Sequence, residues 1–188
     1  VTRTFPVSGS FTPAQRDLYQ LVLGAQKEAL EAVRPGATID AIHDLTVKRL
    51  TEGLVSMGLL KGPAEERIAE GNAVGKLKAG SPEEKAAPRG YRKYYMHRTS
   101  HWLGLDVHDC ALATREEYMD AELRPGMVLT VEPGLYFKAD DLLAPERFRG
   151  TGVRIEDDIL VTQDGCENLS AGMPRSSADV EAWIARLR

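Results

Sequence analysis

The sequence predicts an α+β fold, with helices in the first half of the chain and short, mostly antiparallel strands in the second. Apolar residues recur at steps of three and four over residues 13–33 and 38–58, which is typical of helices that bury one face. After Lys93, short apolar segments separated by turn residues indicate strands. Because the helices precede the strands and no repeat is present, the order favours α+β over an alternating βαβ arrangement.

The first predicted helix has a clear beginning and end. Thr12 is a good N-cap, Pro13 occupies the first helical position, and Gln15 completes a capping box. An Arg-Pro-Gly run at residues 34–36 ends the helix.

The chain after the first helix is predicted to contain a second helix and then a long loop. The second helix spans about residues 38–58, and His43 lies beside its apolar stripe, where a surface or core-edge histidine is the favoured interpretation. A short helix is expected over Ala64–Glu70. Gly71–Arg92 is rich in Gly, Lys, Glu and Pro, so we expect a mobile surface loop, either an active-site flap or plain disorder.

The second half of the chain is predicted to form strands, a hairpin and a final helix. Asp164-Gly165 is typical of a hairpin turn. Ser177 or Asp179 caps the final helix, which is expected to end near Leu187. The predicted strands are Met127–Glu132, Leu135–Phe137, Gly152–Glu156 and, past a kink, Asp158–Thr162.

The composition is that of a soluble globular protein. The chain has 188 residues, of which 43% are hydrophobic and 28% charged, enough for one sizeable core. With 24 basic and 28 acidic residues, the net charge of −4 argues against a nucleic-acid partner. The apolar runs are far shorter than the roughly 20 residues of a membrane span, so no membrane partner is expected. Two cysteines without CxxC spacing, Cys110 and Cys166, favour a reducing compartment, and we expect a cytoplasmic protein.

Two segments place ionisable side chains where a purely structural role is not the favoured one. Residues 96–109 contain three of the four histidines, His97, His101 and His108. Imidazole is both a common metal ligand and a proton donor, so three histidines together favour a functional site. Glu132 ends an apolar strand directly before a turn, so its carboxylate lies either exposed at the strand tip or in a cleft.

A third segment, residues 152–159, contains an arginine and a glutamate on one strand face. With a period of two, Val153 and Ile155 face one side, and Arg154 and Glu156 face the other. On an exposed face this is a surface ion pair worth little. On an inner face the pair needs partners, and a metal ion would supply them. One imidazole and two carboxylates from separate segments are suited to binding Mn²⁺, Co²⁺ or Zn²⁺, and they do not form a thiolate site.

Several other site types have no motif in this sequence. There is no HExxH helix, no GxSxG elbow, no P-loop and no GxGxxG. Ser100 lies between histidines, but the sequence indicates no acid partner for a hydrolase triad.

These segments resemble the pita-bread metallopeptidase family, which includes aminopeptidase P, prolidase and methionine aminopeptidase. The resemblance is strongest to the bacterial aminopeptidase P (Xaa-Pro aminopeptidase) group, covers essentially the whole chain, and implies a pita-bread fold in which helices pack on a curved, mostly antiparallel sheet. The matching segments are His97–Asp109, Pro125–Tyr136, Gly152–Asp158 and Thr2–Pro6, the last resembling the stretch that follows the family's second metal-binding aspartate.

The resemblance also implies roles for individual residues. Glu132 would handle the proton of the attacking water, the histidines of the pocket would stabilise the oxyanion and bind the peptide, and Arg154 would orient its neighbours. The implied ligands of a two-metal centre are His101, Glu132 and Glu156. The implied catalytic residues are His97, His108, Glu132 and Arg154, and the implied substrate-binding residues are His97, His108 and Tyr136.

The activity implied by the resemblance is removal of the N-terminal residue from peptides with proline in second position. A hydroxide bridging two divalent ions would attack the scissile carbonyl, with Mn²⁺ the expected ion and Co²⁺ or Zn²⁺ the alternatives. The expected partners are the peptide substrate and further copies of the protein in a homo-oligomer. The alternatives are a prolidase acting on Xaa-Pro dipeptides, a non-catalytic peptide-binding module and, last, a metal-free relative of creatinase type.

The family's site has five ligands, and two of them are aspartates that precede the segment matching Thr2. We therefore expect residues 1–188 to be the C-terminal portion of the catalytic domain, without the N-terminal domain and the first part of the catalytic domain. On its own, this chain is expected to bind metal weakly and to be inactive.

Overall fold

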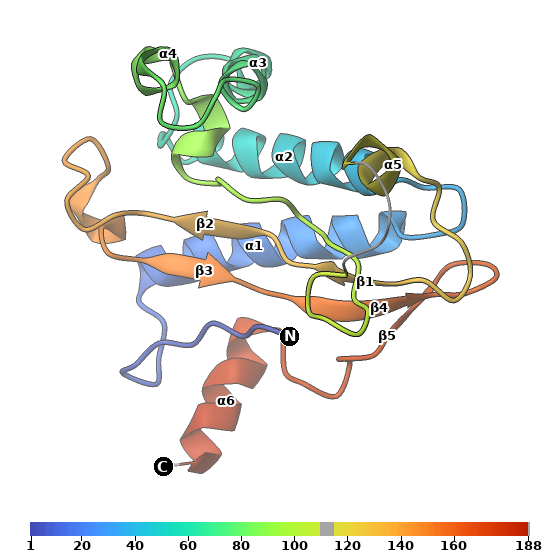
Figure 1. The fold of residues 1–188 in the computed structure, drawn as a ribbon. Coiled ribbons are helices and arrows are strands. Elements are labelled where there is room, and N and C mark those ends of the chain that lie inside the picture. Colours follow the sequence, from blue (N-terminus) through green and yellow to red (C-terminus); the bar gives the residue numbers. More distant parts are fainter. Residues whose placement is uncertain (110–114, 188) are drawn as a thin grey trace.

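Two long helices lie beside the strands in the computed structural model, which describes residues 1–109 and 115–187 (Figure 1). The first, α1 (Pro13–Ala32), contacts β1, β2 and β3, and the second, α2 (Ile39–Ser56), packs along α1. The predicted capping box is confirmed, since Thr12 Oγ1 accepts from the Gln15 backbone N–H and the Gln15 side chain accepts from the Thr12 N–H.

The strands form two antiparallel ladders that follow one another along the chain. In one, β1 (Val128–Val131), β4 (Asp157–Val161) and β5 (Cys166–Asn168) lie in the order β1-β4-β5. In the other, β2 (Gly134–Tyr136) pairs with β3 (Gly152–Arg154). The register pairs Val131 with Asp157 and Gly134 with Arg154. The pairing of β1 with β4 therefore ends, and that of β2 with β3 begins, at the same level, where Glu132 and Glu156 lie.

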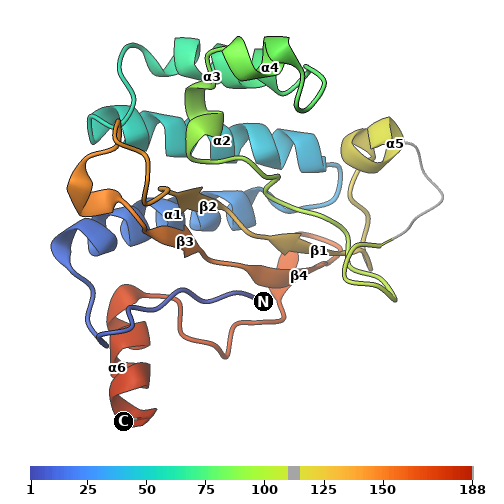
Figure 2. The same cartoon turned by 60° about the vertical axis from the view of Figure 1, so that its left-hand side comes forward.

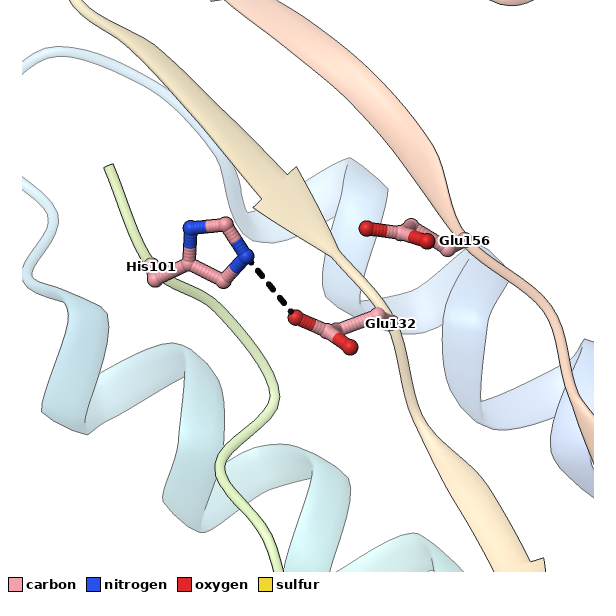
Figure 3. Close-up of side chains that lie close together, drawn as sticks. All are labelled: His101, Glu132 and Glu156. Atoms are coloured by element: carbon pink, nitrogen blue, oxygen red, sulfur yellow. Dashed lines mark ion pairs between the residues drawn. The ribbon is translucent and has the colours of Figure 1, made fainter. Parts of the chain in front are cut away.

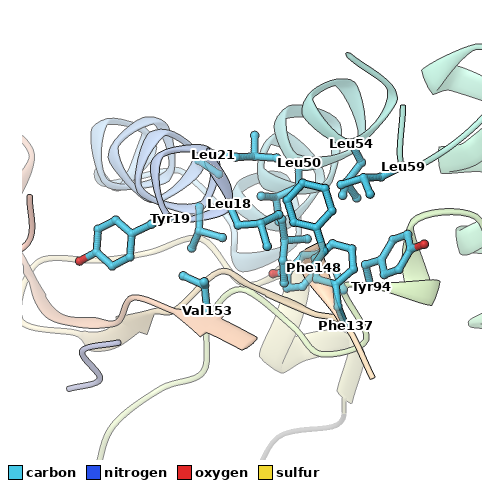
Figure 4. Packing of buried hydrophobic residues seen from close by; sticks show 14 of the residues in the cluster. Leu18, Tyr19, Leu21, Leu50, Leu54, Leu59, Tyr94, Phe137, Phe148 and Val153 are labelled. Atoms are coloured by element: carbon cyan, nitrogen blue, oxygen red, sulfur yellow. The ribbon is translucent and has the colours of Figure 1, made fainter. Parts of the chain in front are cut away.

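Two apolar clusters hold the helices on the strands. The larger joins α1 and α2 to β2, β3 and the tyrosines of residues 91–95. Part of this cluster is shown in Figure 4. Its fully buried members include Leu18, Leu50, Leu54, Tyr91, Tyr94, Tyr95, Leu135, Phe148 and Ile155. The smaller lies under β1 and β4 and includes Ala29, Ile39, Ile42, Leu129, Val131 and Ile159. Burial of this kind contributes roughly 25 cal/mol per Å² of apolar surface and is the main stabilising term for the fold.

The prediction of a mobile loop over Gly71–Arg92 is wrong. The region contains α3 (Ala64–Val74), α4 (Pro82–Ala86) and the 3₁₀ turn η1 (Gly90–Lys93), and α3 and α4 lie on the far side of α2 from the strands (Figure 2). The physical reason is tertiary packing: the Tyr91 ring is buried against α3, and α4 has its own N-cap.

The remaining elements are short, apart from the last helix. α6 (Ser177–Leu187) matches the predicted final helix, whereas α5 (Arg115–Asp120) and the 3₁₀ turn η2 (Glu146–Phe148) had no counterpart in the sequence analysis. Cys110 lies outside the described residues. Within the part of the chain that is described, no helix has the length and apolar character to cross a membrane.

Candidate metal centre

Three of the predicted site residues meet where the strand pairs are interrupted: His101, Glu132 and Glu156 (Figure 3). Each offers one ligand atom, and these atoms all lie within 4.8 Å of one another. His101 Nε2 lies 3.2 Å from Glu132 Oε1. The three side chains are between 12% and 17% exposed, so the cluster is largely shielded from solvent but not closed off from it.

The segment that carries His101 is fixed along β1 by backbone hydrogen bonds. Thr130 N–H donates to the His101 carbonyl at 2.9 Å, and Glu132 N–H donates to the Thr99 carbonyl at 2.7 Å. In the ring, His101 Nδ1 is 3.1 Å from the Trp102 carbonyl, to which it donates. With Nδ1 bonded in this way, Nε2 is the ring atom that faces the two carboxylates and is available to a metal ion.

The two glutamates lie close enough that their charges interact. Burial raises the pKa of Glu132, and the charge of Glu156 raises it further, while His101 and Arg154 act in the opposite direction. The Thr130 hydroxyl donates to Glu132 Oε1 at 3.2 Å. Two carboxylates and an imidazole lone pair facing one another require a proton or a cation between them. This donor set therefore fits a divalent metal ion.

Glu156 lies between β3 and β4 and is held by the N-terminal segment. Thr2 forms an antiparallel bridge with Glu156, with N–H to carbonyl distances of 3.2 and 3.0 Å. The Thr2 hydroxyl also donates to Glu156 Oε2. The N-terminal segment thus fixes a member of the cluster through this bridge.

A second polar network lies beside the three-residue cluster. Arg154 Nε donates to the Tyr136 hydroxyl at 2.7 Å, and this hydroxyl donates to His97 Nε2 at 2.8 Å. His97 Nδ1 donates to the Arg98 carbonyl at 2.7 Å, which fixes the neutral tautomer. Burial lowers the pKa of His97 in agreement with a neutral ring. Arg154 Nη1 is 3.7 Å from Glu132 Oε2, so the network reaches the cluster.

The remaining predicted residue, His108, is exposed and packs edge-on against His101 with ring centroids 4.4 Å apart. All seven predicted site residues therefore lie in one connected region. Thr2 and Thr130, whose hydroxyls bond the glutamates, were not among the predicted site residues. Thr130 could have been found, because it lies two residues before Glu132 on the same strand face.

His43 is a buried core histidine, which confirms the core-edge interpretation over a surface one. Its side chain is 4% exposed, and Nδ1 accepts from the Thr99 N–H at 3.3 Å. Since Thr99 also contacts the Tyr95 hydroxyl at 2.7 Å, His43 supports the segment that leads to His101. It therefore acts on the cluster only through this segment.

Comparison with known proteins agrees with this arrangement. Metallopeptidase family M24 matches residues 1–163. Xaa-Pro aminopeptidase 2 of Streptomyces coelicolor is 50% identical over 186 residues, which are 99% of this chain and 36% of that protein. Xaa-Pro aminopeptidase of Escherichia coli is 42% identical over 188 residues, 100% of this chain and 38% of that protein.

Solved structures show the same similarity. The Pseudomonas aeruginosa aminopeptidase PepP superposes with a TM-score of 0.83 at 41% identity, over 98% of this chain and 37% of that one. Zinc-substituted E. coli aminopeptidase P in complex with product has a TM-score of 0.83 at 42% identity, over 99% of this chain and 38% of that one. The predicted pita-bread fold is confirmed. The chain spans a little over a third of the length of these relatives.

Proposed function

The chain belongs to metallopeptidase family M24, and from this membership and the geometry of the site we propose that it serves a metallo-aminopeptidase that removes the N-terminal residue from peptides with proline in second position. The observation that carries the proposal is the convergence of His101, Glu132 and Glu156 within 4.8 Å. We further propose that residues 1–188 form the C-terminal portion of the catalytic domain.

The metal is proposed from the chemistry of the donor set. One imidazole nitrogen and two carboxylates suit Mn²⁺, Co²⁺ or Zn²⁺, and we propose a centre of two divalent ions, with Mn²⁺ as the first candidate. When bound, such ions polarise a carbonyl and make water a nucleophile near neutral pH. His101, Glu132 and Glu156 would hold them.

The chain's own groups supply positioning and proton transfer in this proposal. Glu132, whose pKa burial raises, is suited to hold the proton of the attacking water. His97 and His108 contact the peptide and stabilise the developing oxyanion. Arg154 and Tyr136 keep His97 in one orientation, and Tyr136 also lines the substrate site. The tertiary amide bond before proline has no N–H, so these groups must recognise the carbonyl and the proline ring.

The proposal is tested with the complete gene product, stripped of metal with a chelator and then supplied with Mn²⁺. Two peptides of equal length are compared, with proline or alanine in second position. We expect release of the first residue from the proline peptide only, and only with metal. Glu132→Gln should lower kcat/KM by about 10³-fold or more, whereas Glu167→Gln, at an exposed position of β5, should leave it unchanged.

Other outcomes separate the alternatives. Cleavage restricted to Xaa-Pro dipeptides would indicate a prolidase. Peptide binding without cleavage, in a folded and metal-loaded protein, would indicate a non-catalytic binding module. Homo-oligomer formation and a cytoplasmic location stay predictions; light scattering and fractionation of cells that express the complete protein test them.

A further inference from the structure

The Asp157 carboxylate, on the residue after Glu156, is completely buried and fully bonded. Its Oδ1 accepts from Arg3 at 2.6 Å, and its Oδ2 accepts from Arg175 at 2.9 Å, Asn168 at 2.8 Å and Gln26 at 3.2 Å. These donors come from the N-terminal segment, the loop before α6, β5 and α1. A buried carboxylate needs such partners, because an unpaired charge in the interior is strongly destabilising.

Arg3 connects this buried carboxylate to Glu156 itself. Its side chain is only 3% exposed, and Nη1 donates to the Glu156 carbonyl at 2.7 Å and to the Thr2 carbonyl at 2.9 Å. Nε donates to the Pro174 carbonyl at 2.8 Å. One guanidinium therefore bonds both backbone partners of the Thr2–Glu156 bridge while its other end is fixed by Asp157.

The bonds to Asp157 also affect Glu156, because neighbouring side chains of an extended strand alternate between its two faces. Glu156 and Asp157 are consecutive, so their side chains point to opposite faces of the strand. Asp157 points toward Gln26 of α1, and Glu156 points toward His101 and Glu132. Because the Asp157 side chain is anchored from four sides, the direction of the Glu156 side chain is fixed as well.

We propose that Arg3 and Asp157 are positioning residues that hold Glu156 in the orientation needed to bind metal. The inference rests on the proposed function only in naming Glu156 a ligand. Loss of a group that orients a ligand typically costs 10- to 100-fold in metal affinity. A pair that served only folding would stabilise the protein without affecting the metal.

The test uses the complete gene product and Arg3→Gln, Arg3→Lys and Asp157→Asn. The control is Arg16→Gln, since Arg16 pairs with Glu181 at a similar distance of 2.8 Å, in a more exposed position, and does not contact the cluster. Mn²⁺ affinity is measured by calorimetry, and the ligand environment by the visible absorption of the Co²⁺-loaded protein. We expect Arg3→Gln to weaken Mn²⁺ binding about 10- to 100-fold and to change the Co²⁺ spectrum. Arg3→Lys should restore part of the affinity, and Arg16→Gln should change neither property.

A second readout needs no metal. In the metal-free protein, amide exchange of Thr2 and Glu156 should rise by roughly tenfold or more in Arg3→Gln, because the bridge opens more easily. If Mn²⁺ fails to bind the wild type, the proposed function is wrong, and the exchange rates still decide whether Arg3 positions Glu156. Unchanged affinity, spectrum and exchange in both Arg3→Gln and Asp157→Asn would overturn the inference. If Arg3→Gln does not fold, Arg3→Lys and Asp157→Asn are subjected to the same measurements.

Discussion

The Tyr136 hydroxyl connects the arginine and the histidine of the site, and it provides a prediction at the scale of one atom. In Tyr136→Phe, His97 Nε2 loses its donor and Arg154 Nε loses its acceptor. We expect kcat/KM on the proline peptide to fall by about 10- to 100-fold, because His97 is no longer held. The free energy of unfolding should fall by only about 1–2 kcal/mol.

Steady-state kinetics and urea unfolding of the complete protein provide both numbers. Tyr91→Phe is the matched control, because the Tyr91 hydroxyl donates to Asn72 Oδ1 of α3 at 3.1 Å, away from the cluster. It should change stability by a similar amount and leave kcat/KM unaffected. Equal kinetic losses in the two variants would show that the Tyr136 hydroxyl has no specific role at the site.

At the residue scale, the sequence revealed the site residues whose type or position is unusual in an ordinary fold. Three histidines in one segment and two glutamates at strand ends are unusual, and all five lie in the site. Thr2 was missed because hydroxyl side chains are common on strands and carry no distinguishing pattern, whereas Thr130 shares a strand face with Glu132 and could have been found. The role of Thr2 depends on the pairing of strands, which one sequence does not specify.

At the scale of an element, the contact between His43 of α2 and the segment that carries His101 makes the free energy of unfolding depend on pH. Burial lowers the pKa of His43 to about 4, and its Nδ1 must stay unprotonated to accept from Thr99. The unfolded chain binds a proton near pH 6.5 and the folded chain only near 4, so stability is full above pH 6.5 and falls on acidification. The loss through this group amounts to about 3 kcal/mol at most.

Chemical unfolding of wild type and His43→Asn at pH 7 and pH 4.5 tests this pH dependence. Asn keeps an acceptor atom but does not titrate. We expect the wild type to lose more stability than the variant between the two pH values, since all other acid-sensitive groups are shared. Parallel pH dependences would show that His43 is protonated in the folded protein at its ordinary pKa.

The packing of η1 on α3 depends on a glycine. Gly90 has a φ of +49°, and a Cβ there would lie 2.0 Å from the Arg67 carbonyl oxygen. Gly90→Ala should therefore destabilise the protein by about 3 kcal/mol or more, as backbone must move. Gly80→Ala is the control: its φ is +79° with nothing within 4 Å, so it should cost only about 1 kcal/mol. Thermal unfolding of both variants measures the difference, and equal losses would contradict a steric origin.

The region around Gly90 also shows which elements one sequence predicts and which it does not. Helix α1 was predicted from its capping box and periodic apolar face, and α2 from its periodic apolar face. Gly71–Arg92, which includes the last turn of α3, was predicted as a mobile loop because its composition is polar and rich in glycine. Its order comes from Tyr91, buried against Gly71 of a neighbouring helix, and such a contact is not visible in local composition.

At the scale of the whole molecule, the cluster joins parts of the chain that are far apart in sequence. His101 comes from the segment along β1, Glu132 follows β1, and Glu156 is bridged to the N-terminal segment. The order of these motifs could be predicted from the resemblance, but their convergence depends on β1 pairing with β4. A cation bound by all three would therefore oppose global unfolding.

Because metal binding is coupled to folding, Glu156→Gln should change the free energy of unfolding in opposite directions with and without metal. In the metal-free protein, Glu156→Gln removes the repulsion between two partly buried carboxylates, so its free energy of unfolding should equal or exceed that of the wild type. With Mn²⁺ at 100 times its Kd, the wild type should gain about 2.7 kcal/mol and the variant much less. The order of stabilities should then reverse.

Thermal unfolding of the complete protein with chelator and with Mn²⁺ measures both states, and Glu167→Gln should follow the wild type in each. If Mn²⁺ stabilised Glu156→Gln as much as the wild type, the ion would be bound elsewhere, because a cation held by this cluster cannot keep its affinity when one of its charged ligands becomes neutral.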